Sequence, residues 1–248
     1  MSTWQLGAGS ITATERELIA VPNGGGRGRP AVLMPHGAGA TSRDYVYDVA
    51  ARRQVELLLQ AGLVVCAPDL LGDNWGVEAA AQLLDQYRPL LAQRHGTDAE
   101  RIALAPTSMG DLTAMTYLRL FPQRVACIGG VMPAADTDDI RDRNTFGVER
   151  AQIDARWGVT HPAPLPAYAN PLREPALSAL AATDVPVRLW YSEGDRVTRP
   201  QFVRQLATAL GGTAVKVSEL LDHSTALALA VPAQDYVRFF DAHTRRAP

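Results

Sequence analysis

Short apolar segments alternate with segments of helical periodicity along most of this 248-residue chain. Alternation of this kind predicts a mostly parallel central sheet, because parallel neighbours need a crossover connection and a helix supplies it. Helices are then expected on both faces of the sheet, which agrees with strands that are apolar throughout. We expect strands at 10–21, 31–35, 63–67, 101–105, 126–131, 185–191 and 214–220, and helices at 44–59, 78–94, 111–120, 201–210 and 232–243.

The composition is sufficient for a full core, because 47% of the residues are apolar and α/β chains of this length routinely form one domain. We therefore expect a single domain over residues 1–248, with the strands at 10–21 and 31–35 paired as an antiparallel edge. The regular pattern weakens at 132–177, which is polar and then rich in proline. We therefore predict that this segment is a small lid insertion over a pocket.

The charge pattern excludes several classes of partner. Net charge is −2 without long runs of like charge, so we expect neither nucleic-acid nor membrane binding. No signal peptide or membrane-spanning apolar run is present, which predicts a cytoplasmic protein. Cys66 and Cys127 lie in apolar segments, which favours buried free thiols over a disulfide. Because metal-ligand spacings and phosphate-binding glycine fingerprints are also absent, no metal and no cofactor are expected.

Residues 101–114 carry the strongest chemical signal, an apolar strand that runs into Ser108 and leaves through Gly110 into an amphipathic helix. A serine hydroxyl is a weak nucleophile, and a tight turn between strand and helix exposes it in a cleft near a helix N-terminus. The pattern predicts Ser108 as a nucleophile, and the alternative is an ordinary turn serine.

Asp195 and His223 follow the two last strands of the predicted sheet and are the side-chain types that such a serine needs. His223 would accept the serine proton and return it to the leaving group, while Asp195 would orient the imidazole. Glu193 and Asp222 are the alternatives to Asp195. Of these, Asp222 is adjacent to His223 in sequence, which is too close for it to bend back onto the ring.

The strand at 31–35 ends in a glycine-rich turn that can direct backbone N–H groups at a bound oxygen. By position, we expect the N–H groups of Ala38 and Met109 to form an oxyanion hole. Other residues near this edge would line a substrate pocket, because ligands of open α/β sheets bind beyond the carboxyl ends of the strands. The pocket candidates are His36, Gly37, Trp75 and Trp157.

The order of Ser108, Asp195 and His223, each just beyond a strand, resembles that of the α/β-hydrolase superfamily from roughly residue 11 onward. Residues 97–104 and 194–197 look like the dienelactone hydrolase and prolyl-oligopeptidase-like esterase branches. The resemblance implies the α/β-hydrolase fold. Two positions depart from the superfamily pattern: Pro106 stands at the first glycine of the usual elbow, and Asp111 stands where a further glycine is common.

These features predict a carboxylesterase-like serine hydrolase that cleaves its substrate through an acyl-enzyme. The expected substrate is a small-molecule or polymer-attached ester. A peptidase or a thioesterase is an alternative, because the same acyl chemistry serves all three. A non-catalytic member of the fold that binds a ligand or a partner is a further alternative, motivated by Pro106 and Asp111.

Overall fold

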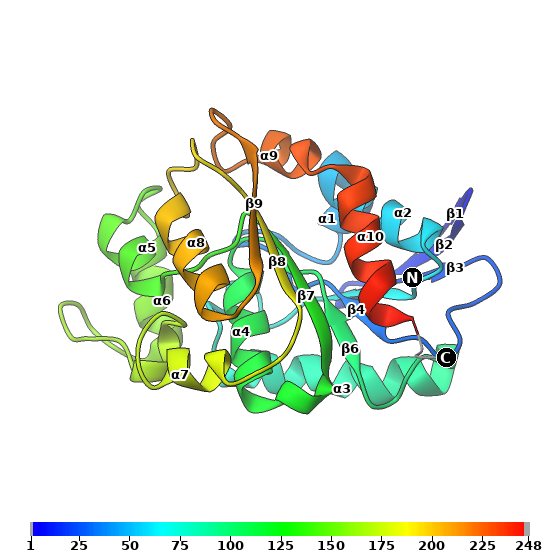
Figure 1. The fold of residues 1–248 in the computed structure, drawn as a ribbon, viewed down its shortest axis with the longest axis horizontal. Coiled ribbons are helices and arrows are strands. Elements are labelled where there is room, and N and C mark those ends of the chain that lie inside the picture. The colour runs from blue at the N-terminus through cyan, green and yellow to red at the C-terminus, as the bar shows by residue number, and fades with distance from the viewer. Residues whose placement is uncertain (1, 246–248) are drawn as a thin grey trace.

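The computed structural model describes residues 2–245, and its centre is one twisted sheet with the strand order β1-β2-β3-β5-β4-β6-β7-β8-β9 (Figure 1). The pairs β1–β2, β2–β3 and β3–β5 are antiparallel, and every later pair is parallel. The strands are β1 Ser2–Leu6, β2 Gly9–Ala13, β3 Glu17–Pro22, β4 Ala31–Leu33, β5 Val65–Pro68, β6 Ile102–Leu104, β7 Val125–Val131, β8 Val187–Ser192 and β9 Thr213–Ser218.

Helices cover both faces of the sheet, as the sequence predicts. Helices α3, α4 and α8 bury their apolar residues on one face, while α2 and α10 bury theirs on the other (Figure 1). The helices are α1 Asp44–Tyr47, α2 Val49–Gln60, α3 Glu78–His95, α4 Gly110–Leu120, α5 Thr137–Arg143, α6 Glu149–Trp157, α7 Ala176–Ala181, α8 Pro200–Ala209, α9 Thr225–Ala230 and α10 Ala233–Thr244.

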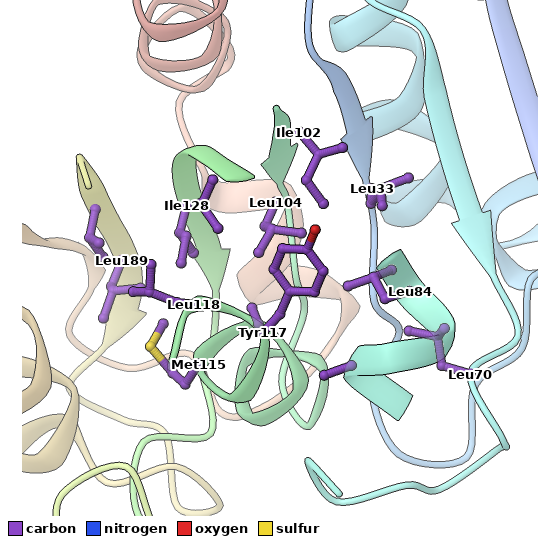
Figure 2. Packing of buried hydrophobic residues seen from close by; sticks show 14 of the residues in the cluster. Leu33, Leu70, Leu84, Ile102, Leu104, Met115, Tyr117, Leu118, Ile128 and Leu189 are labelled. Atoms are coloured by element: carbon purple, nitrogen blue, oxygen red, sulfur yellow. The ribbon is translucent and has the colours of Figure 1, made fainter. Parts of the chain in front are cut away.

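The core under α4 fixes this helix against the strands that precede and follow it (Figure 2). Leu104 of β6, Ile128 of β7 and Tyr117 of α4 belong to one fully buried cluster. The Tyr117 hydroxyl donates to Asp85 of α3 at 2.7 Å, so burial of the ring leaves its polar group paired. The N-terminus of α4 is thereby held at the carboxyl end of β6.

The antiparallel edge differs from the sequence prediction. The expected strand at 10–21 is a hairpin of β2 and β3, because the Thr14 hydroxyl accepts from the N–H groups of Arg16 and Glu17 and turns the chain. Strand β3 pairs with β5 and not with β4, so the expected pairing of 10–21 with 31–35 was wrong. Strand β1 was missed altogether.

The expected helix at 44–59 is interrupted at Asp48, which has an extended backbone. The Asp48 carboxylate accepts from the N–H groups of Ala50 and Ala51, both at 2.9 Å, and begins α2 as an N-cap. The apolar periodicity continues across this break, which is why the pattern predicts one helix. Helix α9 was also missed, and it lies shortly after His223.

The segment at 132–177 forms α5, α6 and the start of α7 between β7 and β8. Arg156 of α6 donates to the Asp73 carbonyl, 2.7 Å away in the loop after β5. Arg143 at the end of α5 donates to the Val197 carbonyl, 2.5 Å away beyond β8. The segment therefore joins two loops at the carboxyl edge of the sheet, and its role as a lid stays a prediction.

Cys66 in β5 and Cys127 in β7 are both buried free thiols, as predicted. Burial raises the pKa of both thiols, because a thiolate is poorly solvated in the core. Among the helices of residues 2–245, not one has the length and apolar character needed to span a membrane.

The close approach of α4 to the strand edge makes Gly110 a sensitive position. A Cβ at Gly110 would overlap the carbonyl group of Pro35. We predict that Gly110→Ala lowers the free energy of unfolding by about 1–3 kcal/mol, as overpacking does. Gly7 is the matched control, since a Cβ there meets no atom within 4 Å. Urea unfolding of both variants tests this, and equal stabilities would contradict it.

Candidate active site

Ser108 lies in the turn between β6 and α4 with a left-handed backbone, φ +53°. A serine takes this conformation at a cost and keeps it only where surrounding bonds hold it. Here the Ser108 N–H donates to the Val131 carbonyl at 3.1 Å, while the Ser108 carbonyl accepts from the N–H groups of Asp111 and Ala134. Hydrogen bonds to Val131 at the end of β7, to Ala134 just after β7 and to Asp111 in α4 therefore hold the serine in a sharp turn.

Three side chains from three separate loops form a continuous line of hydrogen bonds. The Nε2 atom of His223 lies 2.7 Å from the Oγ atom of Ser108, and its Nδ1 atom lies 2.8 Å from the Oδ2 atom of Asp195. Asp195 is 3% exposed. Its Oδ1 atom accepts from the N–H groups of Val197 and Thr198 at 2.9 Å, and its Oδ2 atom also accepts from the Thr198 hydroxyl. The carboxylate is therefore fixed in place before it meets the imidazole.

The two alternative acids are engaged elsewhere. Glu193 pairs with Arg204 and accepts from the Tyr191 hydroxyl at 3.2 Å. Asp222 pairs with Arg196, which lowers the pKa of this carboxyl to about 2. Of the three predicted acids, only Asp195 contacts the ring of His223.

The glycine-rich turn after β4 lies directly against the serine. A Cβ on Gly37 would be 3.3 Å from the Ser108 Cβ atom. The Gly39 N–H donates to the Oδ1 atom of Asp73 at 2.6 Å and is thereby occupied. The N–H groups of Ala38 and Met109 have no acceptor within residues 2–245. Two unpaired backbone donors beside Ser108 can bind an oxygen that becomes negatively charged during a reaction.

His36 stands behind this turn rather than beside the hydroxyl of Ser108. Its ring is 1% exposed, and its Nδ1 atom donates to the Gly37 carbonyl at 2.8 Å. Its Nε2 atom lies 3.5 Å from the Oδ1 atom of Asp69. The ring therefore braces the backbone of the turn, and His36 is also among the residues that line a cavity.

Two cavities within residues 2–245 open beside Ser108 and His223, and Ala38 and Gly39 line both. The first cavity, here called the first lobe, has a volume of about 330 Å³. It lies against α1 and α2 and is lined by Gln54, Tyr45 and Thr225 among others. The second lobe, of about 210 Å³, lies toward α5 and α6 and is lined by Trp75, Ile140 and Phe146 among others. No group of three or more metal-ligating side chains occurs in these residues.

The predicted pocket residues divide between the two lobes. His36 and Gly37 line the first lobe, and Trp75 lines the second. Trp157 lines neither, because its ring packs behind Trp75 and its Nε1 atom donates to the Trp75 carbonyl at 3.2 Å. Trp157 therefore supports the wall of the second lobe from outside.

Sequence reasoning missed Asp73 and Gln54. Asp73 anchors the glycine-rich turn. The sequence places its loop at the same edge of the sheet but does not show which side chain of the loop contacts the turn. Gln54 carries a readable signal, since it lies four residues after Ala50 and four before Leu58 on the buried face of α2. A lone amide on an apolar helical face indicates either a buried partner or a cavity.

Asp111 departs from the pattern of a surface carboxylate at a helix N-terminus. It is 0% exposed, and neither of its oxygens has a hydrogen-bond partner within the described residues. Its side chain occupies space that Gly130 of β7 leaves open, and it lines neither lobe. Burial raises the pKa of this carboxyl well above its ordinary value, so the neutral form is favoured in the folded protein.

Solved structures of other proteins have the same fold. An S-formylglutathione hydrolase from Agrobacterium tumefaciens is similar with a TM-score of 0.72 at 14% identity, covering 99% of both chains. A fluorophosphonate-binding serine hydrolase from Staphylococcus aureus has a TM-score of 0.70 at 10% identity, covering 96% of both chains. A thermostable esterase from Pseudomonas putida has a TM-score of 0.66 at 20% identity, covering 99% of this chain and 83% of the other.

Sequence comparison adds nothing to this likeness, since no protein-family model and no curated protein matches the chain. The structural likeness extends over nearly the whole chain. The chain therefore has the α/β-hydrolase fold that its sequence predicts.

The buried carboxyl of Asp111 yields a prediction about stability. We expect Asp111→Ala to raise the free energy of unfolding by about 1–3 kcal/mol near neutral pH, because it removes an unpaired buried polar group. The raised pKa means that the folded state keeps a proton that the unfolded state loses above its ordinary pKa. The contribution of Asp111 to the stability of the native chain therefore falls as pH rises from about 4.

The gain from Asp111→Ala should accordingly be largest near neutral pH and should shrink toward about pH 4. Urea unfolding of the native chain and the variant at both pH values measures this. A variant that is less stable near neutral pH would contradict the prediction.

Proposed function

We propose that this chain is a serine hydrolase that cleaves carboxylic esters through an acyl-enzyme. The observation that carries the proposal is the line of hydrogen bonds from Asp195 through His223 to Ser108, which ends at two cavities beside two unpaired backbone donors. The esterases and serine hydrolases among the similar structures support the same reaction class.

In the proposed mechanism, the Oγ atom of Ser108 attacks the ester carbonyl while the Nε2 atom of His223 takes its proton. The carbonyl oxygen becomes negative and accepts from the N–H groups of Ala38 and Met109. His223 then protonates the departing alcohol, which leaves an acyl group on Ser108. Water, deprotonated by His223, attacks this acyl group. When the second oxyanion collapses, His223 returns the proton to the Oγ atom of Ser108, which releases the acid and restores the serine.

Asp195 has an electrostatic role in this scheme. Imidazole becomes a cation when it accepts the serine proton, and a carboxylate 2.8 Å from its Nδ1 atom stabilises that cation. Backbone donors at 197 and 198 hold the carboxylate, so little reorganisation is needed when the charge develops.

The same chemistry would serve a peptidase or a thioesterase. Of the similar proteins, the one from Pseudomonas putida is named an esterase, whereas the S-formylglutathione hydrolase acts on a thioester, so a thioesterase is the second candidate. We propose a small-molecule ester as substrate and one domain as the functional unit, which all nine described strands support by joining a single sheet. The chemistry of the proposed scheme is complete without a cofactor.

The proposed nucleophile can be tested at Ser108. The native chain should hydrolyse p-nitrophenyl esters of short acids, and Ser108→Ala should lower kcat by at least about 10⁴-fold, because no other group supplies the nucleophile. Initial rates across acyl chains from acetyl upward measure this under identical conditions.

A fluorophosphonate probe provides an independent control for Ser108. It should add one phosphonyl group to the native chain and none to Ser108→Ala, as judged by intact mass. If the folded native chain were neither labelled nor faster than the variant, the proposal would fail, and a binding role would be tested instead.

The positioning of the oxyanion donors can be tested at Asp73, which holds the glycine-rich turn through Gly39. We expect Asp73→Ala to lower kcat by about 10- to 100-fold with little change in KM, because misplaced donors weaken binding of the transition state more than that of the substrate. Asp73→Asn keeps an oxygen that can accept from the Gly39 N–H, so it should retain most of the activity. Equal losses in both variants would contradict this positioning role.

A further inference from the structure

The two lobes beside Ser108 differ in whether they contain a polar side chain that has no hydrogen-bond partner in the protein. In the second lobe, the carboxylate of Asp73 accepts from the Gly39 N–H and from the Gln152 amide. The carboxylate of Glu149 accepts from the N–H groups of Phe146 and another residue of its own turn. These two carboxylates are already paired with the protein, and the Gln152 amide is held by its bond to Asp73.

The remaining lining of the second lobe is largely hydrocarbon. Its apolar side chains come from the loop after β5, from the segment between β7 and β8, and from the loop that carries Asp195: Trp75, Ile140, Phe146, Val148 and Val197. A lobe with an apolar wall and paired polar groups favours a hydrocarbon chain.

The first lobe contains a polar side chain without a partner. Gln54 lines this lobe and is 4% exposed, yet its amide makes no hydrogen bond within residues 2–245. Neither polar atom of the amide is sealed from solvent, so both retain access through the cavity. A buried amide normally has a partner, because an unpaired one costs free energy.

Carboxylates and a hydroxyl share this lobe with Gln54. Asp44 and Asp48 line it, but Asp44 accepts from Thr41, and Asp48 accepts from two N–H groups of α2 and from the Thr225 hydroxyl, so both carboxylates are already paired with the protein. No lysine or arginine lines the lobe among the described residues. The Gln54 amide therefore remains to bond an alcohol hydroxyl, to which it can both donate and accept, whereas the two carboxylates repel an anionic substrate.

We propose that the first lobe binds a hydroxylated alcohol half of the ester, with Gln54 as the residue that recognises its hydroxyl, and that the second lobe takes the acyl chain. This inference rests on the proposed function and deepens it, since it names the substrate class. The space beside Gln54 exists because Ala50, Ala51 and Ala228 present only methyl groups to the lobe.

Two esters that share one acyl group test the inference. Glycerol monobutyrate and n-propyl butyrate release the same acid, and they differ only in the two hydroxyls of the alcohol. We expect the native chain to prefer the glycerol ester. Gln54→Met conserves volume and removes the amide, so it should lower the ratio of the two kcat/KM values by about three- to tenfold.

Two further variants sharpen the result. Gln60→Met is the matched control, because Gln60 is exposed at the end of the same helix, and it should leave the ratio unchanged. Gln54→Asn keeps an amide but withdraws it from the lobe, so it should lower the ratio as Gln54→Met does. Thermal unfolding of each variant shows that the fold is retained.

The possible outcomes distinguish a failure of the inference about Gln54 from a failure of the proposed esterase function. An unchanged ratio in Gln54→Met, or an equal loss with both esters, would overturn the role of Gln54 in recognition while hydrolysis of n-propyl butyrate still supports an esterase. If the native chain hydrolysed neither ester, the proposed function and the inference would both fail.

Discussion

The left-handed backbone of Ser108 is the constraint on which the rest of the site depends. A serine in strand or helix conformation would continue its element, and its hydroxyl would not project at the edge of the sheet. The turn persists because Val131 of β7 accepts the Ser108 N–H and because Gly110 lets α4 approach the chain at Pro35. The buried cluster around Tyr117 keeps β6, β7 and α4 in this arrangement, so the core supports the turn.

Three carboxylates lie close to His223 in sequence or in space, and hydrogen bonding distinguishes them. Glu193 and Asp222 each pair with an arginine at the surface, which compensates their charge. Asp195 is buried, and neutral N–H and hydroxyl donors hold it instead. Neutral donors orient a carboxylate without cancelling its charge, so Asp195 can stabilise a cation on the imidazole that the other two could not.

The sequence predicts best what depends on local pattern. The helix expected at 78–94 is Glu78–His95, and Gly96 ends it in the left-handed conformation that a C-terminal glycine favours. Breaks caused by one side chain, at Thr14 and Asp48, do not alter the apolar periodicity and were missed. In the site, the order of Ser108, Asp195 and His223 can be read from the sequence. The contact between Asp73 and the glycine-rich turn cannot, because it forms only when two loops that are distant in sequence meet in the fold.

Asp111 and Gln54 are both buried polar side chains, but their burial has different consequences for the protein. Each is a buried polar side chain without a partner among the described residues, but only the carboxyl of Asp111 is cut off from solvent and therefore lowers the stability of the folded state. Asp111 is sealed between α4 and β7, where no substrate can reach it, so its cost is never recovered. Gln54 faces a cavity, where its amide keeps access to solvent and a ligand that bonds to it replaces that solvent. The amide gives selectivity for such a ligand, because a hydrocarbon in the same place excludes solvent and leaves the amide unpaired.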